Sequence, residues 1–198
     1  MLNWDAPAAN PVFACTTGFG VRRGSTTYVL TADHCATYPD QVHDAANELM
    51  GGVHAGDWDK DLLLLNARGY FKIFDGGPAT TATKNVLGWG YHATNELLCH
   101  SGAVTGVRCG LRTQSGSTYA LYGCDSDGDC FHRHGLVKTV QVDGLTAAQR
   151  GDSGGPVFSL MGSGVRAKGI VIGGGGTVLY FQDWADVIAL FGAYPVTP

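Results

Sequence analysis

Gly151-Asp152-Ser153-Gly154-Gly155-Pro156 decides how the rest of this sequence is interpreted, because it sets a serine among glycines directly after an acidic residue. Acyl transfer needs an exposed serine hydroxyl and backbone N–H groups that face the oxygen that becomes negative in the tetrahedral intermediate. The N–H groups of Gly151 and Ser153 are candidates for this oxyanion hole. The segment therefore predicts that Ser153 is a nucleophile.

Two segments upstream carry the groups that would activate such a serine. Leu30-Thr31-Ala32-Asp33-His34-Cys35 follows a β-branched and aromatic stretch, so His34 comes just after a predicted strand and is the candidate general base. Of three nearby aspartates, only Asp61 abuts the run of four leucines that follows, where a half-buried carboxylate can orient an imidazole. The expected catalytic groups therefore occur in the order His34, Asp61, Ser153.

This order of motifs resembles the chymotrypsin-like serine proteases, in particular the bacterial secreted branch that includes the streptogrisins and α-lytic protease. The resemblance covers nearly the whole chain. Four segments carry it in the family's order: Cys15-Thr16-Thr17-Gly18-Phe19, Thr31-Ala32-Asp33-His34-Cys35, Leu98 to Gly110, and Gly169 to Gly174. It implies an endopeptidase in which Ser153 attacks, His34 transfers the proton and Asp61 fixes the histidine tautomer.

An all-β fold is expected because 30 glycines separate many short β-branched and aromatic stretches. The resemblance implies two packed six-stranded antiparallel β-barrels, residues 1–95 with His34 and Asp61 and residues 96–198 with Ser153. Residues 12–19, 28–32, 62–66 and 86–89 would build the first barrel. Residues 102–107, 117–122, 136–142, 156–160, 167–172 and 178–181 would build the second. Apolar residues at helical spacing predict a C-terminal helix over about 183–191.

Six cysteines form an even set with no C-x-x-C arrangement, which favours disulfides and an oxidising, extracellular location. The sequence by itself leaves all fifteen pairings open. The resemblance implies Cys15 with Cys35 and Cys99 with Cys109, which leaves Cys124 with Cys130. The acidic residues Asp125, Asp127 and Asp129 suggest calcium, but the EF-hand spacing is absent, so a solvated turn closed by a disulfide is favoured.

Composition excludes several classes of function. A net charge of −4 without runs of like charge argues against a nucleic-acid partner. No apolar run approaches the ~20 residues that cross a bilayer, so no membrane partner is expected. The first eleven residues are too polar for a signal peptide, which suggests a mature form of a secreted protein. With 198 residues the chain can bury its own core, so we expect a monomer that acts on peptides or proteins without a cofactor or metal.

The resemblance also implies a substrate-binding set, which consists of Ala147, Arg150, Ile172, Gly173, Gly174 and Val178. Ala147 stands where trypsin-like members carry an aspartate, so a Lys or Arg side chain of the substrate would lack a counter-ion. A small or apolar side chain is therefore the expected preference, with an acidic group bound by Arg150 as the alternative. Ile172 replaces a serine that in the family hydrogen-bonds the catalytic aspartate.

Two charged neighbours of the triad complete the expectations. By resemblance, the Asp152 carboxylate pairs with Arg108 and so holds the oxyanion turn open. Asp33 stands where the family carries a small residue, and its carboxylate either raises the pKa of the His34 imidazole or faces solvent, which is the favoured expectation. Two other functions use the same residues: an esterase or acyl hydrolase with the same triad, and a non-catalytic binding protein on a protease scaffold.

Overall fold

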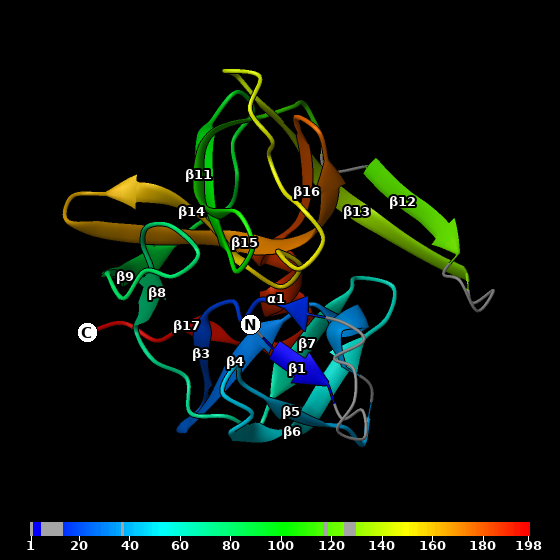
Figure 1. Ribbon diagram of the computed structural model, residues 1–198, viewed down its shortest axis with the longest axis vertical. Coiled ribbons are helices and arrows are strands. Elements are labelled where there is room, and N and C mark those ends of the chain that lie inside the picture. The colour runs from blue at the N-terminus through cyan, green and yellow to red at the C-terminus, as the bar shows by residue number, and fades with distance from the viewer. Residues whose placement is uncertain (1, 5–13, 37, 117–118, 125–129) are drawn as a thin grey trace.

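The structure is a computed structural model that describes residues 2–4, 14–36, 38–116, 119–124 and 130–198. The described strands form two antiparallel-rich sheets that stack one above the other in Figure 1. One sheet has the strand order β17-β3-β4-β7-β6-β5-β1-β2. The other has the order β12-β13-β11-β10-β14-β15-β9-β8, and β16 pairs with both β13 and β15.

Most of the first sheet comes from the N-terminal third of the chain. Its strands are β1 (Leu2–Trp4), β2 (Ala14–Cys15), β3 (Gly20–Arg23), β4 (Thr26–Thr31), β5 (Gln41–His43), β6 (Leu49–Asp57), β7 (Leu62–Leu65) and β17 (Tyr194–Pro195). The four leucines of β7 are all buried because this strand lies between β4 and β6 and is covered on both faces. The core position of β7 fixes the turn before it, where Asp61 lies.

The second sheet contains the rest of the strands. They are β8 (Lys72–Phe74), β9 (Thr83–Trp89), β10 (Leu97–Gly102), β11 (Gly106–Thr113), β12 (Tyr119–Cys124), β13 (Cys130–Gln141), β14 (Pro156–Met161), β15 (Gly164–Gly175) and β16 (Val178–Asp183). The far ends of β12 and β13 form a hairpin that projects from the body of the molecule (Figure 1).

The strand predicted over residues 86–89 exists, but its assignment to the first barrel is wrong. β9 runs parallel to β15 in the second sheet, with Val86 opposite Val165. Gly164 makes this close approach possible, since a Cβ there would lie 2.4 Å from the carbonyl oxygen of Asn85. The all-β class is confirmed, whereas the division between residues 95 and 96 stays a prediction.

The predicted C-terminal helix is confirmed as α1 (Trp184–Phe191). The Asp183 side chain caps its N-terminus by accepting a hydrogen bond from the Ala185 N–H at 2.8 Å. Gly192 ends it in the left-handed conformation that favours glycine. The ring of Trp184 packs edge-on against Phe19 at 5.3 Å, which ties the helix to the first sheet.

Two of the implied disulfides are present, Cys15–Cys35 and Cys99–Cys109. Cys130 is also disulfide-bonded, and the backbone of Cys124 lies opposite it in the β12–β13 register. The side chain of Cys124 is outside the described part, so its pairing stays a prediction. Residues 125–129, with the three acidic side chains of the calcium hypothesis, also lie outside it. Among the described residues no helix is long and apolar enough to span a membrane.

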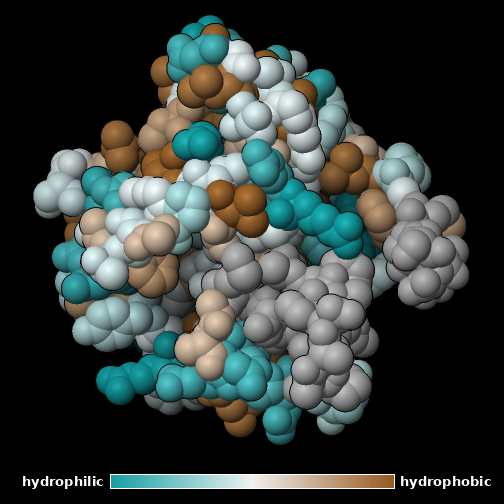
Figure 2. All heavy atoms as spheres, in the orientation of Figure 1, coloured by the Kyte–Doolittle hydropathy of each residue, from teal (hydrophilic) through white to brown (hydrophobic). Residues whose placement is uncertain are grey.

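On the face drawn in Figure 2 the apolar side chains are spread out and do not form one large patch. Figure 2 shows brown residues scattered among teal and white ones on the visible face. Large exposed apolar side chains such as Tyr38, Leu160 and Tyr122 belong to different strands and loops. Such scattered exposure is ordinary for a protein surface.

Candidate active site

The three predicted catalytic residues come from three separate places in the fold. His34 lies in a single 3₁₀ turn, η1 (Asp33–Cys35), directly after β4, and Asp61 ends the turn before β7. Ser153 lies in the loop between β13 and β14. The backbone N–H of Thr16 donates to the carbonyl oxygen of Ser153 at 2.8 Å, which fastens this loop to the first half of the chain.

His34 and Asp61 form a close pair. The Oδ2 atom of Asp61 lies 2.6 Å from Nδ1 of His34, and Oδ1 accepts from the His34 backbone N–H at 2.8 Å. Burial raises the pKa of the Asp61 carboxyl, but the charge and hydrogen bonds of His34 and the Arg133 charge outweigh it and hold that pKa below its usual range. Asp61 is therefore ionised and keeps the proton of neutral His34 on Nδ1, which leaves Nε2 free to accept one.

The loop around Ser153 is fixed by hydrogen bonds that leave two amides unused. Thr16 donates from Oγ1 to the carbonyl oxygen of Gly151 at 2.7 Å, and the Gly154 N–H donates to Val171 at 2.8 Å. Gly151 has a φ of 101°, which favours glycine. Among the described residues, the N–H groups of Gly151 and Ser153 donate no hydrogen bond. Both can therefore bind an anionic oxygen.

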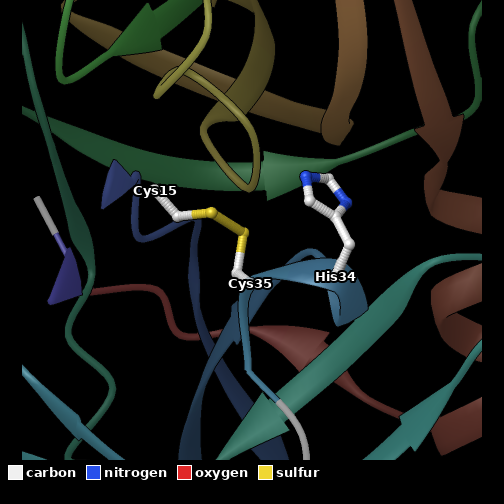
Figure 3. Close-up of side chains that lie close together, drawn as sticks. All are labelled: Cys15, His34 and Cys35. Carbon is white, nitrogen blue, oxygen red and sulfur yellow. A yellow bond between two sulfur atoms is a disulfide. The ribbon is translucent and has the colours of Figure 1, made fainter. Parts of the chain in front are cut away.

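The Ser153 loop and the His34 ring each lie beside the Cys15–Cys35 disulfide. Figure 3 shows the His34 ring next to this disulfide, pointing toward the second sheet. The Sγ atom of Cys35 is 3.9 Å from the carbonyl oxygen of Ser153. No hydrogen bond joins the Ser153 hydroxyl to His34 in the described part of the chain, as is common in unliganded enzymes, where this bond tightens with substrate.

The same cluster does not supply a metal site. One ligand atom each from Cys15, His34 and Cys35 lie within 4.8 Å of one another. Both sulfurs are consumed by the disulfide and cannot form the thiolates that bind a metal. The cluster is therefore a structural support for His34.

The expected ion pair between Asp152 and Arg108 is contradicted by the structure. Asp152 is fully buried, and its carboxylate accepts hydrogen bonds from the N–H groups of Val104, Thr105 and Gln149 and from the Thr105 hydroxyl, at 2.8 to 3.0 Å. Arg108 donates only to the carbonyl oxygen of Val107 among the described residues. Four neutral donors satisfy the carboxylate, so no arginine is needed.

Comparison with known proteins agrees with this geometry. Streptogrisin-D from Streptomyces griseus is 28% identical over 90% of this chain and 44% of its own length, and streptogrisin-C from the same organism is 27% identical over 98% and 40%. Thermobifida fusca Protease A superposes with a TM-score of 0.72 and 28% identity, covering 94% of each chain. No family model matches.

The chain resembles the bacterial chymotrypsin-like serine proteases. It spans about two fifths of the length of the curated relatives it matches. Proteins with the chymotrypsin fold have two β-barrel domains, which agrees with the two sheets seen here.

The segments expected to bind substrate meet next to the nucleophile loop of this chymotrypsin-like fold. Ala147 is fully buried, and its carbonyl oxygen lies 2.6 Å from Nε2 of the buried His100. Gly173 and Gly174 lie on β15, paired with Tyr180 and Leu179 of β16. An apolar, buried residue thus occupies position 147, so this position offers no counter-ion for a basic side chain of a substrate.

The remaining members of that set differ in accessibility. Ile172 is buried in the core, whereas Val178 is half-buried at the start of β16, opposite Gly175. Arg150 is exposed in the loop before Gly151. Ile172 therefore acts through packing, and only Val178 and Arg150 have side-chain surface to offer a ligand.

His100 was not singled out in the sequence, yet it lies behind the nucleophile loop. Burial lowers the pKa of its imidazole, against the opposing effects of Asp152 and of the hydrogen bond to Ala147. A neutral ring must then carry its proton on Nε2 to donate to the Ala147 carbonyl. Its Nδ1 has no partner among the described residues.

Two further charged groups surround Asp61. The Asp33 side chain is half-buried and close to β6, so the expectation that it faces solvent is wrong. Burial first, and then the charges of Asp61 and Asp57, raise the pKa of Asp33 to about 6. Arg133 of β13 is buried next to Asp61, and no motif in the sequence pointed to it.

Proposed function

We propose that this chain is a secreted serine endopeptidase that cleaves peptide bonds through an acyl-enzyme. The observation that carries the proposal is the His34–Asp61 pair, in which both carboxylate oxygens bind the histidine, next to a serine loop with two unused amides. The resemblance to streptogrisins supports it. We propose a monomer acting on peptide or protein substrates.

In the proposed reaction the Ser153 Oγ attacks the scissile carbonyl carbon while Nε2 of His34 takes the hydroxyl proton. The carbonyl π electrons move to the oxygen, whose negative charge binds the N–H groups of Gly151 and Ser153. The tetrahedral intermediate then collapses, and His34 gives its proton to the departing amine. An ester at Ser153 remains. A water molecule then attacks the ester carbonyl carbon while His34 takes its proton. The second tetrahedral intermediate collapses as His34 returns this proton to the Ser153 Oγ, which releases the acid and restores the serine.

Substrate preference is proposed to be for a small or apolar side chain. The buried Ala147 supplies no charge for a basic side chain, and the nearest titratable group behind it, His100, is fully buried. Gly173 and Gly174 are proposed to pair with an extended peptide through their backbone. A peptide-library cleavage profile with dominant Lys or Arg selection would contradict this preference.

The activity is tested by hydrolysis of a peptide anilide together with labelling by an organophosphate. Stoichiometric labelling that is lost in Ser153→Ala, with anilide turnover reduced about 10³-fold or more in Ser153→Ala, His34→Ala and Asp61→Ala, is the expected result. Turnover of a matched ester without the anilide would instead indicate an esterase. Absence of any label would indicate a binding protein.

The chain offers a matched control for the histidine variant. His92 pairs with Asp183 at the same distance as His34 with Asp61, with Nδ1 and Oδ2 separated by 2.6 Å, and its backbone N–H donates to that same Oδ2 at 2.9 Å. This second pair caps α1 and has no role in the proposed reaction. His92→Ala should therefore affect thermal stability and leave turnover per folded molecule unchanged.

A further inference from the structure

The aspartate of the proposed triad has a second charged partner. The Nε atom of Arg133 lies 3.4 Å from Oδ2 of Asp61, the oxygen that also faces Nδ1 of His34 at 2.6 Å. The side chains of Arg133 and Asp61 are 2% and 1% exposed, so water screens this pair very little. One carboxylate oxygen thus faces both a guanidinium and the catalytic imidazole.

Aromatic rings hold the Arg133 guanidinium in place. Its central carbon lies 3.7 Å from the centroid of the Trp58 ring and 5.3 Å from that of Phe131. The Nε and Nη1 atoms have no hydrogen-bond partner among the described residues. Ring faces and the Asp61 charge therefore hold this side of the cation. A buried cation without a counter-charge is strongly unfavourable, so Arg133 and Asp61 depend on each other.

The pair joins the two sheets. Asp61 directly precedes β7 of the first sheet. Arg133 belongs to β13, which pairs with β16 in the second sheet. The contact continues one residue further, where the His134 N–H donates to the carbonyl oxygen of Asp59 at 3.4 Å. A shift of one sheet relative to the other would therefore change the position of Asp61 relative to His34.

Asp61 has no hydroxyl donor from the strand that lines the cleft. Ile172 stands where a serine was expected, and its apolar side chain is buried in the core. Arg133 approaches the same carboxylate from β13 instead. It meets the need of a buried anion for a compensating group.

We propose that Arg133 is a positioning residue that holds Asp61 in the orientation that pairs it with His34. The inference deepens the proposed peptidase function and rests on it for its kinetic consequences. Arg133 is 2% exposed and its ion pair among the described residues is with Asp61, so it positions His34 through Asp61 while its charge also acts on the groups nearby.

Removal of the positive charge should also change the pH dependence. The charged and titratable groups around the Arg133–Asp61 pair are Asp33 and His34 from η1 and Asp57 at the end of β6. Lys60 precedes Asp61 and pairs with Asp186 of α1 at 3.1 Å. Without Arg133 the surrounding charge becomes more negative, which favours the protonated imidazole. The pH at which His34 loses its proton should then rise.

The test compares Arg133→Gln and Arg133→Lys with a matched control, Lys168→Gln. Lys168 is an equally buried cation of the second sheet that pairs with Glu96 at 2.7 Å, away from the triad. The readouts are kcat and KM for a peptide anilide from pH 5 to 9, circular dichroism, and the NMR titration of the His34 ring. The NMR readout needs no turnover.

We expect Arg133→Gln to lose about 10²-fold in kcat with little change in KM, because a misplaced catalytic group costs about that much. Its rate profile and its His34 titration should both move to higher pH. Arg133→Lys should keep the wild-type midpoint and still lose about tenfold in kcat, because an ammonium does not reproduce the stacked, planar guanidinium. Lys168→Gln should change neither.

A folded Arg133→Gln with wild-type kcat and an unmoved His34 titration overturns the proposal, as does an equal shift in Lys168→Gln. Should Arg133→Gln fail to fold, Arg133→Lys decides, and a kcat within twofold of wild type overturns it. Absence of organophosphate labelling in the wild type would refute the peptidase function. The His34 titration would then still accept or reject the Arg133–Asp61 coupling.

Discussion

Thr105→Val tests whether four neutral donors hold the residue before the nucleophile. The Asp152 carboxylate is fully buried, and Thr105 supplies two of its hydrogen bonds, one from its N–H at 3.0 Å and one from its hydroxyl at 2.9 Å. Valine keeps the shape of threonine and removes only the hydroxyl. The substitution therefore takes a single donor from a buried anion and leaves the backbone N–H in place.

The expected loss in the free energy of unfolding depends on the negative charge of the acceptor, the Asp152 carboxylate. A hydrogen bond to a charged group is worth ~1.5–3 kcal/mol. For a chain of this length, each kcal/mol lowers Tm by ~2–4 °C, so Tm should fall by about 3–12 °C. Asp152 precedes Ser153, and the loop carries the amides of the proposed oxyanion hole, so kcat should fall by up to about 10²-fold.

Calorimetry and anilide kinetics, normalised by active-site titration, would measure both effects. Arg108→Ala is the matched control, because the Arg108 side chain donates only to the Val107 carbonyl at 3.4 Å in the described part of the structure. Loss of one long hydrogen bond from this half-buried side chain should alter stability by about 1 kcal/mol or less and leave kcat unchanged. If Arg108→Ala costs as much stability as Thr105→Val, Asp152 depends on the arginine after all and not on the four neutral donors.

Three further perturbations follow from the same structure. Because the pKa of Asp33 is raised from 3.8 to about 6, mainly by burial, its ionisation destabilises the native state as pH rises between these values. Asp33→Asn should therefore stabilise the protein at about pH 7.5 by ~1–2 kcal/mol, allowing for solvent screening, and not at about pH 4; equal melting shifts at both pH values would contradict this. Turnover should rise with pH through the histidine titration, because His34 must be neutral to act as a base, and a rate that is flat from about pH 5 to 9 would argue against that role. Reduction of Cys15–Cys35 and Cys99–Cys109 should lower stability by ~2–4 kcal/mol per bond, measured as Tm with and without reductant.

The fold was predictable where a sequence pattern has one structural solution. The leucine run 62–65 has the length and composition of a strand buried on both faces, and the apolar spacing near the C-terminus matches one face of a helix. β9 was misplaced because a short apolar strand can pair with either sheet. Its partner is decided by the close approach that Gly164 allows, which is a contact distant in sequence.

Local motifs in the sequence predict the reacting groups of the candidate site but not the residues that support them. His34, Asp61 and Ser153 each lie in a short motif of characteristic residue types. The structure brings His34 and Asp61 into contact. The partners of Asp152 are mostly backbone amides, and an amide leaves no residue-type signal in a sequence. The sequence therefore suggested a charged residue, Arg108, as the partner of Asp152, and not the backbone amides.

Arg133 accounts for two departures from the expected pattern together. An aspartate at position 33 and an isoleucine at position 172 each make the setting of Asp61 less favourable, the first by adding negative charge and the second by withholding a hydroxyl. Two carboxylates beside one imidazole would favour its protonated form, which cannot act as a base. A single buried guanidinium both offsets the extra charge and faces the Asp61 oxygen at 3.4 Å. We therefore propose that Arg133 allows an aspartate at position 33 and an isoleucine at position 172 to coexist with the proposed triad, because its guanidinium lies beside the Asp61 carboxylate.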